Sequence, residues 1–312
     1  MNIGFLMDPL SQINIRKDTT FAMLLASQAR GWKNHIIMPE DIWLQNGIAW
    51  ARMQLITVHD DPTHFFDVTK ITEQPLVDLE VLLMRKDPPV NMEFIYLTYL
   101  LEQAESQGLL VLNKPSSLRD ANEKLFTAWF PHCCPKTLVT SKSDLILDFM
   151  DSVENAVIKP LDGMGGHSIF QLSLNDPNHH VIIETVTQHG TKKIMVQEFI
   201  PDIIHGDKRI LMIDGEPVPY ALARVPAQGD FRGNLASGAQ GEGRELTDRD
   251  RWICEQVGPI LKEKKLLLVG LDVIGDYLTE INVTSPTCAR ELDKLFDLDI
   301  AGEFLDVVEE LM

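Results

Sequence analysis

The first 120 residues alternate between short apolar runs and stretches in which apolar residues recur at helical spacing. Continuous apolar runs at residues 3–7, 35–38, 81–84 and 109–112 predict buried strands. Helical spacing over residues 21–31 and 93–108 predicts helices that end near Gly31 and Gly108. Because strands alternate with helices, we expect an N-terminal α/β domain over residues 1–120, with a parallel sheet and crossover helices.

The pattern changes after Pro115, where the apolar runs come in neighbouring pairs. Three pairs predict antiparallel strands: residues 156–159 with 168–172, 209–213 with 217–224, and 266–274 with 277–283. Asp214-Gly215, between the runs of the second pair, is a strong hairpin signal. A capping-box sequence at residues 117–120 predicts a helix through Phe130, and Thr247 opens a helix that Gly258-Pro259 should kink or break.

Residues 226–244 lack a regular apolar pattern. They include Gly229, Gly233, Gly238, Gly241 and Gly243 and little that could anchor a core. A connection of this length and composition is typical of a mobile loop that closes over a ligand. We therefore expect a second domain over residues 121–312, with a central part at about 121–200, a C-terminal part at about 201–312 and this loop within it.

Composition and charge narrow the class of protein. The chain has 312 residues, 45% of them hydrophobic and 24% charged, which is ordinary for a folded protein with more than one core. Its net charge of −18 argues against a nucleic-acid partner, because phosphate contacts need a basic surface. Four cysteines without a C-x-x-C motif predict reduced thiols. With no targeting segment and no apolar run that could span a bilayer, we expect a cytoplasmic protein without a membrane partner.

A glycine-rich motif follows the strand predicted at residues 156–159. Lys159 ends the strand, and Pro160-Leu161-Asp162-Gly163-Met164-Gly165-Gly166 leads to the next one. Glycine allows backbone N–H groups to curl around phosphate oxygens, and a lysine adds positive charge. The motif is therefore a candidate phosphate-binding loop, and the alternative is a glycine-rich hairpin with a surface lysine.

Polar residues interrupt two apolar strands near the C-terminal end. Asp272 lies in the first strand, and Glu280 and Asn282 lie on one face of the second. Their oxygens suit Mg²⁺, and without a cation we expect the carboxylates to repel each other. A two-residue turn at Gly275-Asp276 would place Asp272 on the opposite face from Glu280, so a metal site requires a bulge or an odd-numbered loop. The alternative is a polar sheet face with salt bridges.

Cations are scattered along this acidic chain, and a solvated surface position is the alternative reading for each of them. The candidates for a binding role are Lys124, Lys159, Lys208, Arg209, Arg224 and Arg290. Arg209 and Arg224 differ from the rest because they lie on the two arms of the hairpin around Asp214-Gly215. Pairing through a two-residue turn places Arg209 opposite Tyr220, with Arg224 on the same face farther along.

Together these segments resemble the ATP-grasp superfamily and, within it, the bacterial glutathione synthetases. The resemblance covers nearly the whole chain and is carried by Met7-Asp8-Pro9, Met84-Arg85-Lys86-Asp87-Pro88-Pro89, Asn113-Lys114-Pro115, Asn122-Glu123-Lys124-Leu125, the motif from Lys159 to Gly166, Gly206-Asp207-Lys208-Arg209, residues 214–219, Arg232-Gly233-Asn234-Leu235 and Glu280-Ile281-Asn282-Val283-Thr284-Ser285-Pro286-Thr287. His167 departs from the family pattern, in which a small residue is expected. The resemblance implies an α/β N-terminal pre-ATP-grasp domain followed by an ATP-grasp fold with antiparallel sheets and a glycine-rich lid loop.

The resemblance also implies an activity, the ATP-dependent ligation of γ-glutamylcysteine to glycine. The γ-glutamylcysteine carboxylate attacks the γ-phosphate of ATP to give an acyl phosphate, and the glycine amine then displaces phosphate to yield glutathione. Two Mg²⁺ ions accompany ATP, with Mn²⁺ as an alternative, and the family suggests a homotetramer. Two other readings stay open: another ATP-grasp carboxylate–amine ligase, and a nucleotide-binding module that has lost catalysis.

The same resemblance assigns roles to individual residues. Nucleotide contacts are expected from Lys124, Lys159, Gly163, Met164, Gly165, Gly166, Gln197, Glu198, Phe199, Ile200 and Asp207. In this scheme the lysines hold phosphates, residues 197–200 hold adenine and Asp207 binds ribose. The expected metal ligands are Asp272, Glu280 and Asn282, the expected catalytic residues are Arg209 and Arg224, and the expected substrate-binding residues are Asn234 and Ser285.

Overall fold

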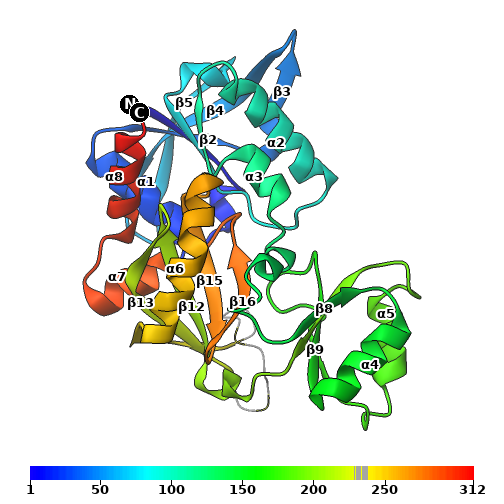
Figure 1. Cartoon of the computed structure of the whole chain (residues 1–312). Coiled ribbons are helices and arrows are strands. Elements are labelled where there is room, and N and C mark those ends of the chain that lie inside the picture. Colours follow the sequence, from blue (N-terminus) through cyan, green and yellow to red (C-terminus); the bar gives the residue numbers. More distant parts are fainter. Residues whose placement is uncertain (228, 230–232, 234–237) are drawn as a thin grey trace.

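Three sheets organise the chain in a computed structural model that describes residues 1–227, 229, 233 and 238–312. Figure 1 shows that the sheet containing β8 and β9 forms, with helices α4 and α5, a lobe set apart from the rest of the molecule. The N- and C-termini lie side by side next to α8 (Figure 1). Within the described part of the chain, no helix combines the length and hydropathy needed to cross a membrane.

The first sheet is mixed rather than parallel throughout. Its order is β3-β4-β2-β1-β6-β7, with β5 paired to β4. The strands are β1 (Asn2–Leu6), β2 (Lys33–Ile37), β3 (Ile42–Gln45), β4 (Ile48–Val58), β5 (Phe66–Pro75), β6 (Val81–Met84) and β7 (Leu110–Leu112), and the flanking helices are α1 (Thr19–Ala29) and α2 (Met92–Glu105). β2, β1, β6 and β7 form the predicted parallel part, whereas β3, β4 and β5 add an antiparallel part that the sequence analysis missed.

The second sheet is antiparallel and has a core of its own. Its order is β10-β9-β11-β8. The strands are β8 (Thr137–Thr140), β9 (Ala156–Pro160), β10 (Phe170–Leu172) and β11 (Ile194–Glu198), and the helices are α4 (Ser143–Val153) and α5 (His179–Val186). Side chains such as Ile146, Ile158 and Val196 pack into a small cluster that shares no residue with the two larger cores among the described residues. The core of this lobe is therefore separate from the cores of the other two sheets.

The third sheet is also antiparallel and shares its cores with the first sheet. Its order is β14-β13-β12-β15-β16. The strands are β12 (Asp207–Ile213), β13 (Glu216–Val225), β14 (Gln240–Glu245), β15 (Leu268–Ile274) and β16 (Tyr277–Asn282), followed or interrupted by α6 (Asp248–Glu263), α7 (Ala289–Phe296) and α8 (Ile300–Glu310). One core joins Leu6 of β1 to Ile210 of β12, and the other joins Phe5 to Leu211. Because neighbouring residues of both strands enter both cores, the first and third sheets form one body.

Two predicted helices differ from the observed ones. The helix expected to run from residue 117 through Phe130 is wrong: α3 (Pro115–Asp120) ends early, and a 3₁₀ helix, Leu125–Trp129, follows. Asn122 causes the break, because its side-chain oxygen accepts hydrogen bonds from the backbone N–H groups of Lys124 and Leu125. In contrast, α6 continues through Pro259. Its buried face, which includes Val257 and Leu261, offsets the hydrogen bond that proline removes.

The end of the predicted lid loop is regular structure. Residues 240–244 belong to β14 and pair with β13, so the irregular segment ends before Gln240. The loop expectation otherwise falls largely on residues 228, 230–232 and 234–237, outside the described residues.

Candidate active site

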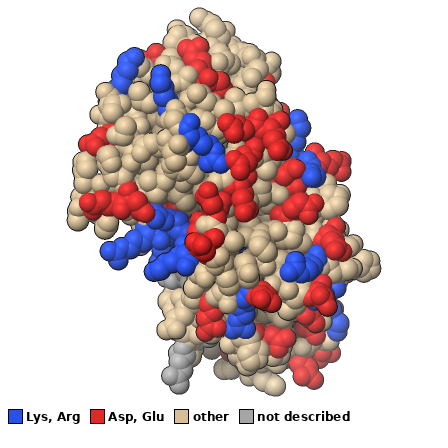
Figure 2. All heavy atoms as spheres, turned by 90° about the vertical axis from the view of Figure 1, so that its left-hand side faces the viewer, with Lys and Arg blue, Asp and Glu red and all other residues tan. Residues whose placement is uncertain are grey.

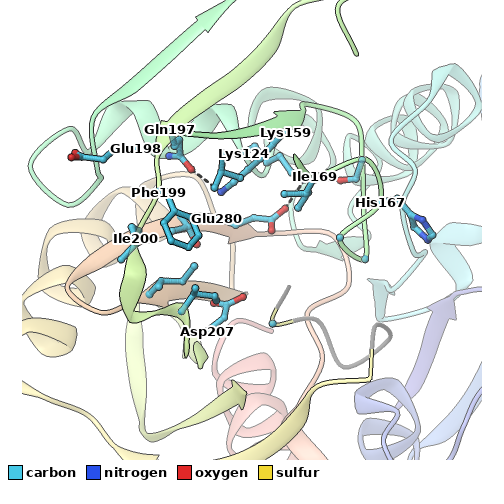
Figure 3. Close-up of a pocket in the computed structure, with 18 residues that line it drawn as sticks. Lys124, Lys159, His167, Ile169, Gln197, Glu198, Phe199, Ile200, Asp207 and Glu280 are labelled. Carbon is cyan, nitrogen blue, oxygen red and sulfur yellow. Dashed lines mark hydrogen bonds and ion pairs between the residues drawn. The ribbon is translucent and has the colours of Figure 1, made fainter. Parts of the chain in front are cut away.

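A cavity opens between the second and third sheets (Figure 3). The residues that line it are Lys124, Val157, Lys159, Gly163, Gly165, Gly166, His167, Ile169, Gln197, Glu198, Phe199, Ile200, Ile203, Asp207, Gly233, Ile274, Thr279 and Glu280. Most of the predicted nucleotide contacts are therefore brought together from three distant parts of the chain. Met164 is an exception, since it does not line the cavity and its side chain is 42% exposed.

Lys159 is held in place by the neighbouring strand. Its Nζ donates to Oε1 of Gln197 at 2.7 Å, and Nε2 of Gln197 donates to Thr137 Oγ1 at 3.1 Å. β9 and β11 pair Lys159 with Met195, which puts Gln197 two residues farther along on the same face. Burial lowers the pKa of Lys159 because it disfavours the charged ammonium group. A bound anion would stabilise this charged form.

The glycine-rich loop after β9 curls toward Lys124. Gly165 and Gly166 have φ angles of 62° and 79°, values that favour glycine. Nζ of Lys124 donates to the carbonyl oxygen of Gly163 at 2.5 Å. His167 lies at one end of the cavity, away from Gln197 and Glu198 (Figure 3). The backbone of this loop can therefore approach a ligand that Lys124 and Lys159 also contact.

The segment after β11 contributes an apolar end to the cavity. Phe199 and Ile200 lie there (Figure 3), and Ile203 and Ile274 line the same cavity. The backbone N–H of Phe199 donates to Asn155 at 3.0 Å, which anchors the segment to the second sheet. An apolar slot at the end of a β-strand suits a flat aromatic base, which supports the adenine role predicted for residues 197–200.

Asp207 is buried at the start of β12 and carries an unused acceptor. Its Oδ2 accepts a hydrogen bond from Arg224 Nη2, whereas Oδ1 has no hydrogen-bond partner in the described part of the chain. Burial and, to a smaller extent, the charge of Asp272 raise the pKa of Asp207 to about 6, against the opposing effect of Arg224. Gly233 lies so close that a Cβ there would be 2.6 Å from Cβ of Asp207. The unused oxygen is a ready acceptor for a ligand hydroxyl.

Two arginines neutralise Asp272. Nε of Arg209 donates to Oδ1 at 2.6 Å and its Nη2 to Oδ2 at 3.1 Å, while Nη2 of Arg224 lies 2.9 Å from Oδ2. Although burial alone would raise it, these guanidinium groups hold the pKa of Asp272 well below its usual range. The expected convergence of the two arginines is observed, but Arg209 faces Leu222 rather than Tyr220. A register shift between Ile210 and Met212 inserts extra residues on β13 and causes this difference.

A bulge also brings Asp272 and Glu280 together. The turn after β15 has two residues, with Ile274 paired to Tyr277, but the register shifts between Asp272 and Val273. Asp272 therefore pairs directly with Glu280, which meets the condition that the sequence set for a metal site. Asn282 follows on the same face and donates through Nδ2 to the Gly270 carbonyl at 3.1 Å.

Lys124, which is held next to β16, neutralises Glu280. Its Nζ lies 2.8 Å from Oε1 of Glu280. Burial alone would lower the pKa of Lys124, but the charge and hydrogen bond of Glu280 raise it. The expectation that the carboxylates repel each other is therefore wrong, because each carboxylate is paired with a buried cation.

Two of the three predicted metal ligands offer a free oxygen to a cation, whereas both oxygens of Asp272 are already in contact with the two arginines. Asp272, Glu280 and Asn282 share one face of the β15–β16 pair. Among the described residues, Oε2 of Glu280 and the side-chain oxygen of Asn282 accept no hydrogen bond. These free carboxylate and amide oxygens are the ligand type that Mg²⁺ and similar ions select.

Several predicted site residues do not line the cavity. Arg209, Arg224, Asp272 and Asn282 only adjoin its lining, and the remaining candidates lie elsewhere or outside the described residues. Ser285 is half-buried in the loop after β16 and does not line the cavity, and Asn234 falls outside the described residues. Lys208 pairs with Asp250, and Arg290 pairs with Asp60. Figure 2 shows acidic side chains spread over one face of the molecule, with lysines and arginines in smaller groups.

Glu123 is a residue whose structural role the sequence analysis missed. Its Oε1 accepts hydrogen bonds from the backbone N–H groups of Val283 and Thr284 and from the Thr284 hydroxyl. Its carbonyl oxygen accepts a hydrogen bond from the Ile281 N–H at 2.8 Å. Glu123 thus fixes Lys124 beside the end of β16. The sequence did offer one indication of this role, because Glu123 belongs to the Asn-Glu-Lys-Leu motif that carries the family resemblance.

Comparisons with known proteins agree with this geometry. The family models for the N-terminal domain and for the ATP-grasp domain of prokaryotic glutathione synthetase match residues 1–119 and 123–297. The chain belongs to the prokaryotic glutathione synthetase family. A glutathione synthetase of Coxiella burnetii is 61% identical over 99% of this chain and 96% of its own length, and one of Pseudomonas syringae pv. tomato is 56% identical over 99% and 97%.

Solved structures place this glutathione synthetase family member in the ATP-grasp fold. The D-cycloserine synthetase DcsG aligns over 99% of both chains with a TM-score of 0.68 and 16% sequence identity. The ATP-grasp ligase PsnB, in a complex with a minimal precursor, Mg and ADP, aligns over 99% of this chain and 97% of its own with a TM-score of 0.61 and 16% identity. At these identities the likeness concerns the fold alone, and it confirms the expected fold class.

Proposed function

We propose that this protein is a glutathione synthetase, an ATP-dependent carbon–nitrogen ligase that joins γ-glutamylcysteine to glycine. The observation that carries the proposal is 61% identity to a curated glutathione synthetase over 99% of the chain, combined with a cavity lined by two lysines and two carboxylates, Asp207 and Glu280, that are paired with cations. Another carboxylate–amine ligase of this fold would share the nucleotide residues but not identity at this level.

The cavity supports one placement of ATP. The adenine would occupy the apolar slot beside Phe199 and Ile200, and the free oxygen of Asp207 would accept a ribose hydroxyl. Lys124 and Lys159 would hold the phosphates under the glycine-rich loop. Lys124, which is buried, and Lys159, which is half-buried, both line the cavity and supply the local positive charge that a nucleotide needs in a chain of net charge −18.

The reaction follows from how these residues distribute charge. The γ-glutamylcysteine carboxylate attacks the γ-phosphate, and the glycine amine displaces phosphate from the resulting acyl phosphate. Arg209 and Arg224 would stabilise the negative charge that builds up in both steps. Divalent ions, Mg²⁺ or alternatively Mn²⁺, would supply further charge neutralisation on the phosphates, held by Asp272, Glu280 and Asn282. Ser285 and Asn234 remain the proposed substrate contacts.

Location and assembly belong to the same proposal. A reaction that consumes ATP and a thiol substrate fits the cytoplasm, and the four cysteines are free in the structure. The family resemblance supports a homotetramer, which sedimentation of the purified protein would test.

Product analysis tests the function directly. Incubation with ATP, Mg²⁺, γ-glutamylcysteine and glycine should give glutathione, ADP and phosphate by mass spectrometry. Replacement of glycine by hydroxylamine should trap the acyl phosphate as a hydroxamate. No ligation with this pair, but ligation with another acid or amine, would replace the proposal with a different ATP-grasp ligase.

A further inference from the structure

Three side chains of types that bind metals converge outside the active-site cavity: His59 and His64 lie in the loop between β4 and β5, and Asp67 lies at the start of β5. Nε2 of His59 lies 3.0 Å from Oδ2 of Asp67, and Nε2 of His64 lies 3.1 Å from the same oxygen. The two imidazole rings stack with centroids 5.5 Å apart and planes 21° apart. All three side chains are exposed, and their ligand atoms lie within 4.8 Å of one another.

The loop that carries this cluster is held at several points. The N–H of His59 donates to Phe65 at 2.9 Å, which closes the loop, and Asp61 accepts hydrogen bonds from the N–H and hydroxyl of Thr63. Asp60 pairs with Arg290 of α7 at 2.8 Å, and Phe65 packs edge-on against Phe21 of α1. The three ligand groups are therefore positioned by backbone and neighbouring contacts and need little rearrangement to bind an ion.

Two of the three ligand–ligand distances in the cluster are close to those around a small tetrahedral ion, and the third is at most 4.8 Å. With metal–ligand bonds of about 2.0–2.1 Å, neighbouring ligands in a tetrahedral site lie about 3.3 Å apart. The two His–Asp distances of 3.0 and 3.1 Å would need to open by only a few tenths of an ångström. Two imidazoles and one carboxylate favour Zn²⁺ over Mg²⁺, which prefers oxygen alone.

We propose that His59, His64 and Asp67 form a surface site for Zn²⁺ or a similar borderline transition-metal ion, with water as the fourth ligand. The site is separate from the proposed Mg²⁺ ligands, and the proposal does not depend on the ligase function. Because the loop is tied to α7 through Asp60 and Arg290, a bound ion stabilises the contact between the first sheet and the C-terminal helices. Its role is structural.

Calorimetric titration of the full-length protein with Zn²⁺, in excess Mg²⁺, tests the site. Excess Mg²⁺ occupies the oxygen ligands of the active site and leaves the histidine cluster available. We expect one Zn²⁺ equivalent in the wild type. His59→Ala and His64→Ala should each weaken binding by at least about tenfold, and Asp67→Asn by about tenfold, because each removes one ligand bond. These residues are exposed, so unchanged melting temperatures without Zn²⁺ should confirm that the variants fold.

A matched control comes from another exposed histidine. His180 stacks near His179 on α5, with ring centroids 4.1 Å apart, and belongs to no three-ligand group among the described residues. His180→Ala should therefore bind Zn²⁺ as the wild type does. Binding of equal affinity in the wild type, His59→Ala and His64→Ala would assign the ion to other groups, such as the free cysteines, and overturn the proposal. Absence of a one-equivalent site in the wild type would do the same.

Discussion

On the third-sheet wall, the cavity-lining Asp207 and Glu280 adjoin buried ion pairs, whereas the wall formed by the second sheet carries a glycine loop and an apolar backbone segment. On the third sheet, Arg209, Arg224 and Asp272 are paired with one another before any ligand binds. On the second sheet, the half-buried Lys159 donates its hydrogen bond to the neutral amide of Gln197, although the charge of Glu280 also acts on it. The first wall is built into the cores shared with the N-terminal sheet, and the second rests on a small core of its own.

This difference separates two tasks. Charge that is already positioned and neutralised can stabilise a transition state without reorganisation, so we assign the chemical steps to the third-sheet wall. A backbone loop and one lysine whose hydrogen bond goes to a neutral amide can bind an anionic ligand directly, so we assign nucleotide affinity to the second-sheet wall. Variants on the two walls should therefore change different kinetic quantities.

The largest effect is expected from Glu280→Gln on the third-sheet wall. It keeps the shape but removes a negative charge from a proposed metal ligand, and turnover should fall by about 10²–10⁴. Stability without nucleotide should also fall, because the buried Lys124 loses the carboxylate that lies 2.8 Å from its Nζ. Turnover across a Mg²⁺ titration and the melting temperature of the nucleotide-free protein measure the two effects.

Asp276→Asn is the matched control for this prediction. Asp276 is exposed in the turn between β15 and β16, four residues from Glu280. The substitution removes the same charge from the same hairpin and should leave turnover unchanged. Wild-type turnover of Glu280→Gln at limiting Mg²⁺ would contradict the metal assignment and remove the chemical task from this wall.

A smaller effect, on affinity, is expected from Lys159→Met on the second-sheet wall. Loss of one charged hydrogen-bond donor to a phosphate should weaken ADP binding by about 10–100-fold. Turnover at saturating ATP should change less. Lys192→Met, which removes a lysine paired with Asp162 on the surface, should alter ADP binding little. If Lys159→Met instead binds ADP normally but turns over slowly, the division of tasks between the walls is wrong.

The parts of the two walls that could be predicted are those that a short stretch of sequence determines. The hairpin around Asp214-Gly215 was predictable because both residues need positive φ, and they have values of 46° and 79°. The glycine loop after Lys159 was visible for the same reason. The pairing of Asp272 with Glu280 was not, because a bulge is set by how β15 and β16 pack rather than by the turn between them.

Other parts of the fold carried weak or misleading signals. β5 is mostly exposed and polar, so its residues show no apolar alternation, and it is a strand because β4 supplies a hydrogen-bonding edge. The helix start predicted from the capping-box sequence at residues 117–120 was wrong, because α3 begins at Pro115 and no side chain caps it. Arg209 lies opposite Asp272 because β12 pairs with β15, whereas the contact of Arg224 needed the extra residues in β13, which place Arg224 opposite Asp207.

Asp207 is an exception to the division of tasks between the two walls. It lies on the third-sheet wall, but we propose that it binds the nucleotide. Its pKa is raised to about 6, so at pH 5 the nucleotide-free protein holds a proton that the unfolded chain would have lost. A ribose hydroxyl donates to the ionised carboxylate, so binding must release this proton below pH 6. ADP affinity should therefore rise with pH up to about 6 and then level off, with about tenfold weaker binding at pH 5 than at pH 7 from this group.

Two variants isolate this smallest effect from the titration of the ADP phosphates. Asp207→Asn cannot ionise, so its affinity should be lower at pH 7 and should retain only the pH dependence of the phosphates. Asp293→Asn removes another carboxyl whose pKa burial raises to about 6, but Asp293 lies at α7 and bonds the Ile300 N–H outside the cavity. It should keep the wild-type profile. Calorimetry from pH 5 to 7.5 measures all three proteins. If wild type and Asp207→Asn show parallel profiles, the carboxylate does not contact the nucleotide, and the third-sheet wall takes no part in nucleotide affinity.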